Sequence, residues 1–193
     1  RDLFANRTGL PGRTGPLEIL CRVNAGPLAA DSWYGDGEEG GWRIVSEGCH
    51  FIDLMQFIAG CAPEQVRADC VRGHLPGAQN DNCVVVLRLA DGSIGTLLYV
   101  ANGDPHFEKE RIEVFGQGRS AVIENWQAAR CVDQGKTRKF SPRRFGPAGG
   151  FGKGHGVEMR RFIEAVRTGG PSPLPFSEAV ACTLATLGCV KSV

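Results

Sequence analysis

The sequence lacks a long hydrophobic run and carries almost no net charge. None of its apolar stretches approaches the ~20 residues that a membrane-spanning helix requires, and its formal net charge is only +1 over 193 residues. Such a chain has no electrostatic means of attracting nucleic acid or an anionic membrane, so we expect neither as a partner. The first residues, RDLFANRTGLPGRTG, contain no apolar segment like that of a secretory signal, which favours a cytoplasmic protein.

Cysteine is plentiful, with eight residues, but the spacings that create cysteine sites are missing. There is no CxxC and no closely spaced Cys/His pair, so the sequence contains no signature of a structural zinc site, and we predict no bound metal. The cysteines are scattered and lie mostly in apolar stretches, at positions 21, 49, 61, 70, 83, 131, 182 and 189. Without a secretory signal, this scatter favours buried, reduced thiols over disulfides.

Motifs that bind phosphate or activate a nucleophile are also missing. No GxGxxG follows a predicted strand, and there is no GxxxxGK[ST], HExxH or GxSxG. Residues 150–156, GFGKGHG, are rich in glycine, but no strand precedes them and no acidic residue follows at the dinucleotide-binding spacing. We therefore predict that no residue of this chain binds a dinucleotide cofactor.

The patterns that are present predict one sheet and several helices. Hairpin signals lie at Asp91-Gly92, around Gly116–Gly118 and around Gly135, where turn residues separate alternating apolar runs. The other predicted elements are a strand at 17–24, a strand in QVRADCVRG, and amphipathic helices at about 44–59, 154–168 and 177–191. This order is typical of an α+β fold. We predict a single domain over 1–193, with an open, mainly antiparallel sheet, helices on one face, and the other face available for oligomer packing.

The predicted helix at 44–59, within GGWRIVSEGCHFIDLMQFIAG, places three polar side chains in one stripe. At ~3.6 residues per turn, Ser46, His50 and Asp53 align, while apolar residues cover the wide arc behind them. Ser46 and Asp53 are within reach of the His50 ring on such a helix, and either can orient it. Imidazole can take a hydroxyl proton near neutral pH, which makes His50 the candidate catalytic residue. The alternative is a histidine that fills a helix–sheet or interdomain seam.

Asn24 and Arg43 join Ser46 and Asp53 as candidate substrate-binding residues. Asn24 ends the first strand, where it either hydrogen-bonds a sugar hydroxyl or forms an ordinary turn. Arg43 stands at the helix start, where it either contacts a hydroxylated or anionic substrate or faces solvent. Asp53 either orients His50 or has a purely structural pairing.

The stretch GGWRIVSEGCHFIDLMQFIAG resembles the signature helix of the substrate-side domain in the glucose–fructose oxidoreductase/inositol dehydrogenase (Gfo/Idh/MocA) family. The resemblance continues in the same order through LEILCRVNAG, IEVFGQGRSAVIEN, KGHGVEMRRFIEAV and PSPLPFSEAV, so it covers nearly the whole chain. The pattern GGxRIxxExCHFID is most similar to a branch in which this domain is attached to a larger, zinc-type dehydrogenase chain.

The resemblance implies the C-terminal, substrate-binding and oligomerising domain of an NAD(P)-dependent oxidoreductase. Its substrate would be the hydroxyl or carbonyl of a sugar, nucleotide sugar or cyclitol. NAD or NADP would be bound by an N-terminal Rossmann domain outside this chain, and the chain alone is expected to be inactive. The implied partners are that Rossmann domain, the small sugar-type substrate, and a second copy of the chain packed through the sheet.

The family also implies which residue is catalytic. Its histidine stands where this sequence has His50, and it often has an aspartate one turn earlier, where this sequence has Ser46 with Glu47 beside it. This departure leaves a second interpretation open, a non-catalytic ligand-binding or oligomerisation module of the same fold.

Overall fold

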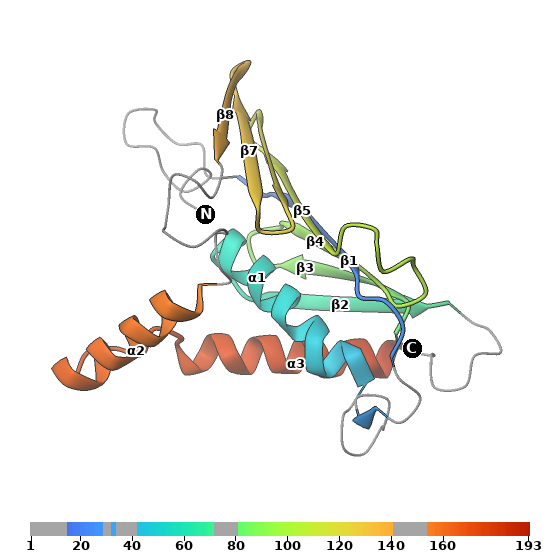
Figure 1. The fold of residues 1–193 in the computed structure, drawn as a ribbon. Helices are drawn as coiled ribbons and strands as arrows, with labels where there is room; N and C mark the ends of the chain where they lie inside the picture. Colours follow the sequence, from blue (N-terminus) through green and yellow to red (C-terminus); the bar gives the residue numbers. More distant parts are fainter. Residues whose placement is uncertain (1–14, 29–31, 34–41, 72–80, 141–153) are drawn as a thin grey trace.

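The computed structural model describes residues 15–28, 32–33, 42–71, 81–140 and 154–193, and in them eight strands form one sheet. The strands are β1 (Glu18–Asn24), β2 (Pro63–Cys70), β3 (Cys83–Leu89), β4 (Ile94–Val100), β5 (Glu110–Gly116), β6 (Arg119–Glu124), β7 (Ala128–Asp133) and β8 (Lys136–Phe140). The helical elements are the π-helical turn η2 (Ile44–Gly48) and the α-helices α1 (Cys49–Ala59), α2 (His155–Thr168) and α3 (Phe176–Ser192). The predicted α+β fold is confirmed (Figure 1).

The strand order contains the predicted hairpins and adds pairings that they did not reveal, one of which is parallel. The order is β2-β3-β4-β1-β5-β6-β7-β8. β1 lies parallel to β4, with Asn24 opposite Val100, and every other neighbouring pair is antiparallel. As a result, the ends of β1, β2 and β4 meet the beginning of β3 at one end of the sheet. We call this end, marked by Asn24, Cys70, Cys83 and Val100, the β4 carboxyl end.

The hairpin turns form where the glycines predicted them. Gly92, Gly118 and Gly135 have φ values of 87°, 72° and 74° and lie in the turns after β3, β5 and β7. Glycine adopts this left-handed region without the steric penalty that other residues pay. The turn residues that mark these hairpins in the sequence are therefore a backbone requirement.

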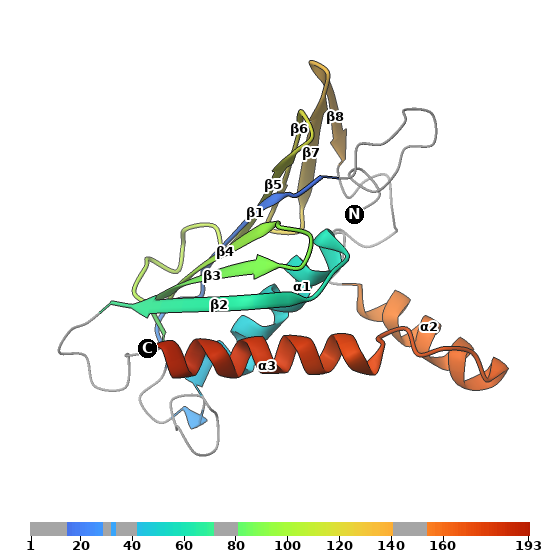
Figure 2. The ribbon, with the colours of Figure 1, turned by 180° about the vertical axis from the view of Figure 1, so that it is seen from behind.

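Helices α1 and α3 cover one face of the sheet at strands β2, β3 and β4 (Figures 1 and 2). The two-residue period of β3 explains why: Cys83, Val85, Leu87 and Leu89 are buried, while the side chains between them are exposed. Alternate strand residues face opposite sides, so the buried set forms one apolar surface. Ile52 and Met55 of α1 and Cys189 of α3 are fully buried in the same core.

The predicted helix at 44–59 differs from observation at its beginning. Its first five residues form the π-helical turn η2, and regular α-helix starts only at Cys49. Its end is confirmed, because Gly60 caps α1 with φ 80°. A π turn adds residues to the turn, so the angular register of Ser46 against His50 changes from that of a continuous α-helix.

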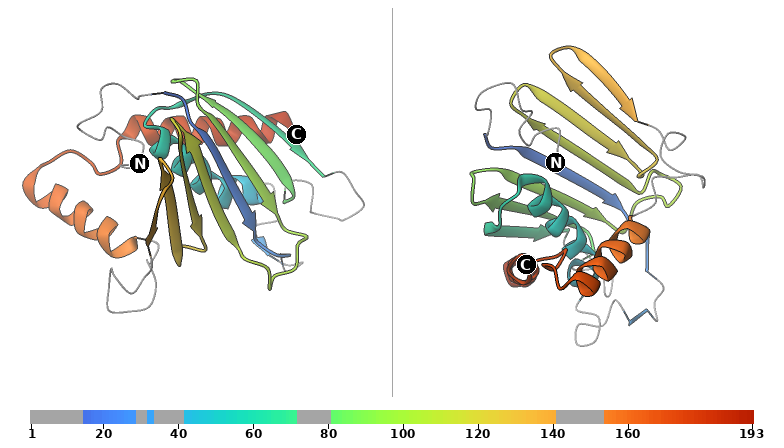
Figure 3. Two further views of the ribbon diagram at one scale, coloured as in Figure 1. Left: turned by 90° about the horizontal axis from the view of Figure 1, so that it is seen from above. Right: turned by 90° about the vertical axis from the view of Figure 1, so that its left-hand side faces the viewer.

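Helix α2 does not lie on the sheet. It projects beside the body of the domain, and none of its residues is buried (Figure 3). Met159, Phe162, Ile163 and Val166 follow the spacing of one helical face and are between 50% and 67% exposed. The α2 stripe, as we name these four residues, is thus an apolar surface without a covering layer in the described chain.

The sheet face opposite α1 and α3 is also partly apolar. Leu20, Val84, Val86 and Leu98 point to this open face and are between 36% and 41% exposed. In the register of the sheet, Val84 lies opposite Leu98 on the neighbouring strand.

Among the described helices, none is long and apolar enough to cross a membrane. Residues 1–14 and the glycine-rich 150–153 lie outside the described part.

The contact between α1 and the sheet generates a stability prediction at Gly95. A methyl group built on Gly95 of β4 would overlap the sulfur of Met55, which is fully buried in the core. Gly95→Ala is expected to lower the free energy of unfolding by about 1–3 kcal/mol, the usual penalty for overpacking a core. Urea denaturation measures the change.

A matched control is Gly156→Ala in the first turn of α2, where nothing lies within 4 Å of the added methyl group. This variant is expected to keep or slightly raise stability, because alanine favours helix over glycine. Equal stability of the two variants would contradict close packing of α1 on β4.

Candidate functional site

His50 stands in the first turn of α1 with its side chain exposed. One turn further along the helix, Asp53 is half-buried and interacts electrostatically with His50. Burial raises the pKa of Asp53, the nearby carboxylate of Glu178 on α3 raises it further, and His50 opposes the rise. Asp53, a predicted partner of the imidazole, therefore interacts electrostatically both with His50 and with a second carboxylate that the sequence patterns did not reveal.

Ser46 does not contribute its hydroxyl to this pair. Its Oγ donates a hydrogen bond of 3.1 Å to the carbonyl oxygen of Trp42, one turn earlier. The hydroxyl thus stabilises the beginning of the π turn. Of the two residues expected to orient His50, only Asp53 has a described interaction with it.

Arg43 faces neither solvent nor an open cleft in this structure. Its side chain is buried, and Nη1 donates a 2.6 Å hydrogen bond to the carbonyl oxygen of Gly26, after β1. Its Nε lies 3.7 Å from Oε1 of Glu47, and its guanidinium carbon lies 5.9 Å from the centre of the Tyr99 ring. A buried guanidinium needs such partners, because an unpaired charge is poorly solvated in a protein interior.

Glu47 and Tyr99 extend this contact into the sheet. The Tyr99 hydroxyl on β4 donates a 2.5 Å hydrogen bond to Oε2 of Glu47. Asp81, just before β3, accepts a hydrogen bond from the backbone N–H of Arg43. Burial raises the pKa of Asp81, while Arg43 opposes the rise. We call Arg43, Glu47, Tyr99 and Asp81 the anchor cluster.

The anchor cluster was missed by sequence reasoning for an identifiable reason. Arg43 lies just before η2, Glu47 lies in η2, Tyr99 lies in β4 and Asp81 lies just before β3. Only the tertiary fold brings them together. The available signal was weak: a tyrosine among the buried positions of an otherwise aliphatic strand, where its hydroxyl requires a partner.

The side chain of Asn24 is held at the same end of the sheet. Its Nδ2 donates a 2.7 Å hydrogen bond to the carbonyl oxygen of Asp104, and its side chain is 7% exposed. Gly103 packs so closely that a Cβ there would overlap Oδ1 of Asn24. The amide therefore holds the segment after β4. Contact between Asn24 and a substrate stays a prediction.

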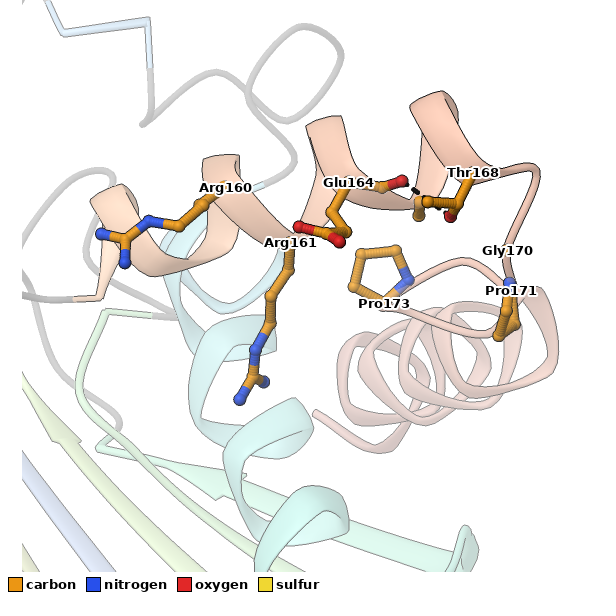
Figure 4. A pocket seen from close by; sticks show the side chains of 8 residues that line it. Arg160, Arg161, Glu164, Thr168, Gly170, Pro171 and Pro173 are labelled. Atoms are coloured by element: carbon orange, nitrogen blue, oxygen red, sulfur yellow. Dashed lines mark hydrogen bonds between the residues drawn. The ribbon is translucent and has the colours of Figure 1, made fainter.

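Two surface clefts are lined by described residues alone, and His50 lines neither of these two. The cleft of about 440 Å³ lies between α2 and the segment that follows it, and most residues that line it are exposed, including Arg160, Arg161 and Glu164. In Figure 4 the two arginine side chains point in different directions, so their charges do not converge on one ligand position. The second cleft, of about 380 Å³, lies at the β4 carboxyl end.

The described residues contain no phosphate cradle and no metal centre. No strand, glycine-rich turn and helix follow one another in the way that holds a pyrophosphate. No group of three or more His, Cys, Asp or Glu side chains in the described part is arranged to hold a metal ion. What the arrangement offers is an exposed imidazole with a neighbouring carboxylate, on a helix whose beginning is anchored to the sheet.

The anchor cluster predicts that Tyr99→Phe destabilises the protein. The change removes a hydrogen bond to a charged, partly buried carboxylate, for which a loss of about 1.5–3 kcal/mol in the free energy of unfolding is expected. Urea denaturation of Tyr99→Phe, Glu47→Gln and the double variant forms a double-mutant cycle. A coupling of at least about 0.5 kcal/mol is expected, and strictly additive effects would show that the two side chains do not interact.

Comparison with known proteins gives the family. The family model described as the GFO/IDH/MocA C-terminal domain matches residues 12–122, which is more than half of the chain. Across solved structures, GenD2 from gentamicin A biosynthesis, in complex with NAD, shares 23% identity over 99% of this chain and 56% of its own, with a TM-score of 0.71. No curated protein matches the chain.

Two further solved structures are similar. UDP-N-acetylglucosamine 3-dehydrogenase GnnA from Acidithiobacillus ferrooxidans has a TM-score of 0.72 and 17% identity, over 94% of this chain and 55% of that protein. A probable dehydrogenase from Thermotoga maritima has a TM-score of 0.66 and 22% identity, over 93% of this chain and 54% of that protein. At these identities the likeness shows the fold, and this chain spans just over half the length of each protein. Together with the family model, it establishes that the chain belongs to the Gfo/Idh/MocA oxidoreductase family, whose C-terminal domain it contains.

Proposed function

We propose that this chain is the substrate-binding domain of an NAD(P)-dependent oxidoreductase that acts on a hydroxyl or carbonyl of a sugar, nucleotide sugar or cyclitol. The observation that carries the proposal is His50. It lies within the part of the chain that matches the family model, on the exposed side of α1 and beside the carboxylate of Asp53. Among the structurally similar proteins, a UDP-N-acetylglucosamine 3-dehydrogenase and an aldose-aldose oxidoreductase from Caulobacter crescentus support this substrate class.

The dinucleotide does not fit the described residues of this chain, and we place it on a Rossmann domain of a longer protein. Two observations support this placement. The chain spans just over half the length of the similar proteins, one of which is complexed with NAD. The four apolar side chains of the α2 stripe are also at least 50% exposed, and a neighbouring domain that packs on them would remove them from water.

His50 would move the proton of the reacting hydroxyl. When a carbinol carbon is oxidised, its hydroxyl proton has to leave, and an imidazole is suited to accept it near neutral pH. The negative charge of Asp53 would stabilise the imidazolium that forms, and the anchor cluster would hold the helix start against the sheet. Arg43 and Asn24 would support the site by fixing the backbone around it, because their polar groups bond to backbone carbonyls. Ser46, whose hydroxyl also bonds to the backbone, would act in the same way.

A second candidate function is a ligand-binding or oligomerisation module without catalysis. One observation favours it: the hydroxyl of Ser46 is bound to the backbone, so the position where the family often has an aspartate contributes no carboxylate to His50. The two candidates make opposite predictions for the loss of His50.

The catalytic role of His50 is tested in the longer protein that contains this domain. His50→Ala is expected to lower turnover at least about 100-fold, the usual contribution of a positioned acid–base group. NAD⁺ reduction would be followed by nicotinamide absorbance with a panel of nucleotide sugars, aldoses and cyclitols. His106→Ala, which removes another exposed imidazole on the turn after β4, is the matched control and should keep turnover. Unchanged turnover in His50→Ala would leave the non-catalytic module.

We also propose that the open face of the sheet joins two copies of the chain. Leu20, Val84, Val86 and Leu98 place apolar side chains on three neighbouring strands of this face, and large exposed apolar patches mark interaction surfaces. We further propose that 1–193 is one domain and that the protein works in the cytoplasm. Its eight cysteines are all free thiols, the state that a reducing compartment maintains.

The oligomer proposal predicts the effect of a charge on the open face. Val84→Arg is expected to weaken self-association at least tenfold, because a buried, unpaired charge is strongly disfavoured at an interface. Sedimentation equilibrium of the purified chain measures it. The control is Phe176→Arg at the start of α3, which adds the same charge away from this face. A parent chain that sediments as a monomer at high concentration would refute this interface.

A further inference from the structure

Cys70 and Cys83 form a facing pair at the β4 carboxyl end. They lie directly opposite one another on the antiparallel strands β2 and β3. The next pair outward is hydrogen-bonded, because the N–H of Val71 donates to the carbonyl oxygen of Asn82 at 2.9 Å. Hydrogen-bonded and non-hydrogen-bonded pairs alternate along such a ladder, so Cys70 and Cys83 are a non-hydrogen-bonded pair. The Cα atoms of such pairs are about 4.5 Å apart, within the range that a disulfide bridges.

The two thiols are already in contact. The side chains of Cys70 and Cys83 hydrogen-bond to one another. Cys189 of α3 is near both of them but is fully buried in the core. The pair is therefore arranged for a bond between β2 and β3, with a third thiol behind it.

Cys70 of this pair is reachable from solvent, while Cys83 behind it is buried. β2 is the first strand of the sheet order and has a neighbour on one side only. Cys70 is partly exposed, and both cysteines line the cleft of about 380 Å³. Asp69, Asn82 and Asn102 supply polar groups to the same cleft. A small polar disulfide can approach Cys70 through this opening.

We propose that Cys70 and Cys83 are a thiol-modification site that forms a reversible disulfide by exchange with a low-molecular-weight disulfide such as oxidised glutathione. The thiolate of Cys70, having released its proton to solvent, attacks one glutathione sulfur. A Cys70–glutathione bond forms and one glutathione thiolate leaves. The thiolate of Cys83 then attacks the Cys70 sulfur, the Cys70–Cys83 bond forms, and the second glutathione leaves. Two cysteine thiols are oxidised, one glutathione disulfide is reduced, and two protons are released.

The bond would act on the anchor cluster. It would close the chain between 70 and 83, and it would fix the position where β3 begins. Asp81 accepts the backbone N–H of Arg43, and Oδ1 of Asn82 accepts the backbone N–H groups of Ala101 and Asn102 at 2.9 and 3.0 Å. Oxidation would thus stiffen the residues that hold the start of the His50 helix to the sheet.

The exchange depends on pH in a defined direction. Burial raises the pKa of both thiols, and only the thiolate attacks. The rate should therefore rise about tenfold per pH unit between neutral and about pH 8.5, and the pair should stay largely reduced during a short exposure at neutral pH.

The test uses the purified, reduced 193-residue chain and oxidised glutathione at about pH 8.5, followed by alkylation of free thiols, digestion and mass mapping. The expected product links the Cys70 and Cys83 peptides with the loss of two hydrogens, raises Tm by about 5 °C, and is reversed by a dithiol. Cys83→Ser should stop at a stable Cys70–glutathione adduct. Cys70→Ser should react at least tenfold more slowly than the parent chain.

A matched pair controls for general oxidation. Cys49 and Cys182 are also neighbours, but the Cys182 thiol donates to the carbonyl oxygen of Cys49 at 3.3 Å, across two helices. Cys49→Ser should leave the Cys70–Cys83 reaction unchanged. A persistent glutathione adduct on the parent chain, a Cys70–Cys189 link, or no modification before global unfolding would each overturn the proposal.

Discussion

The burial of the Arg43 guanidinium is the constraint on which the candidate site depends. A guanidinium cannot lose its charge in a protein, so its burial requires fixed partners. Arg43 finds them in the carbonyl oxygen of Gly26, the carboxylate of Glu47 and the face of Tyr99. These partners belong to the loop after β1, to η2 and to β4. One charged side chain therefore fixes three separate parts of the fold, and it sets where α1 begins and where His50 emerges.

The domain has a well-packed interior and two incompletely covered surfaces. The core between α1, α3 and the sheet is closed, with Ile52, Met55 and Leu87 fully buried. By contrast, the open face and the α2 stripe leave apolar side chains in contact with water. Apolar surface of this extent is unfavourable in isolation. It is the expected condition of a domain that spans just over half the length of the related proteins.

Ser46 stands where the family often has an aspartate, and the start of the helix is held by other contacts of this turn. Glu47, the next residue, carries the carboxylate of this turn, but its oxygens face Tyr99 and Arg43. The π-helical geometry of η2 makes this possible, since the wider turn directs Glu47 toward the sheet end while Ser46 bonds to Trp42. The carboxylate left to interact with His50 is Asp53, on the following turn.

Local pattern alone determined the hairpins at Gly92, Gly118 and Gly135 and the end of α1 at Gly60, because each depends on the backbone and side chains of adjacent residues. It also identified His50 and Asp53 as neighbours on one helix, since that relation is set by helical spacing. The parallel pairing of β1 with β4, the burial of Arg43 and the projection of α2 away from the sheet were decided only by the tertiary structure. Each depends on residues far apart in the chain, such as Gly26, Glu47 and Tyr99, whose mutual distances no local period encodes.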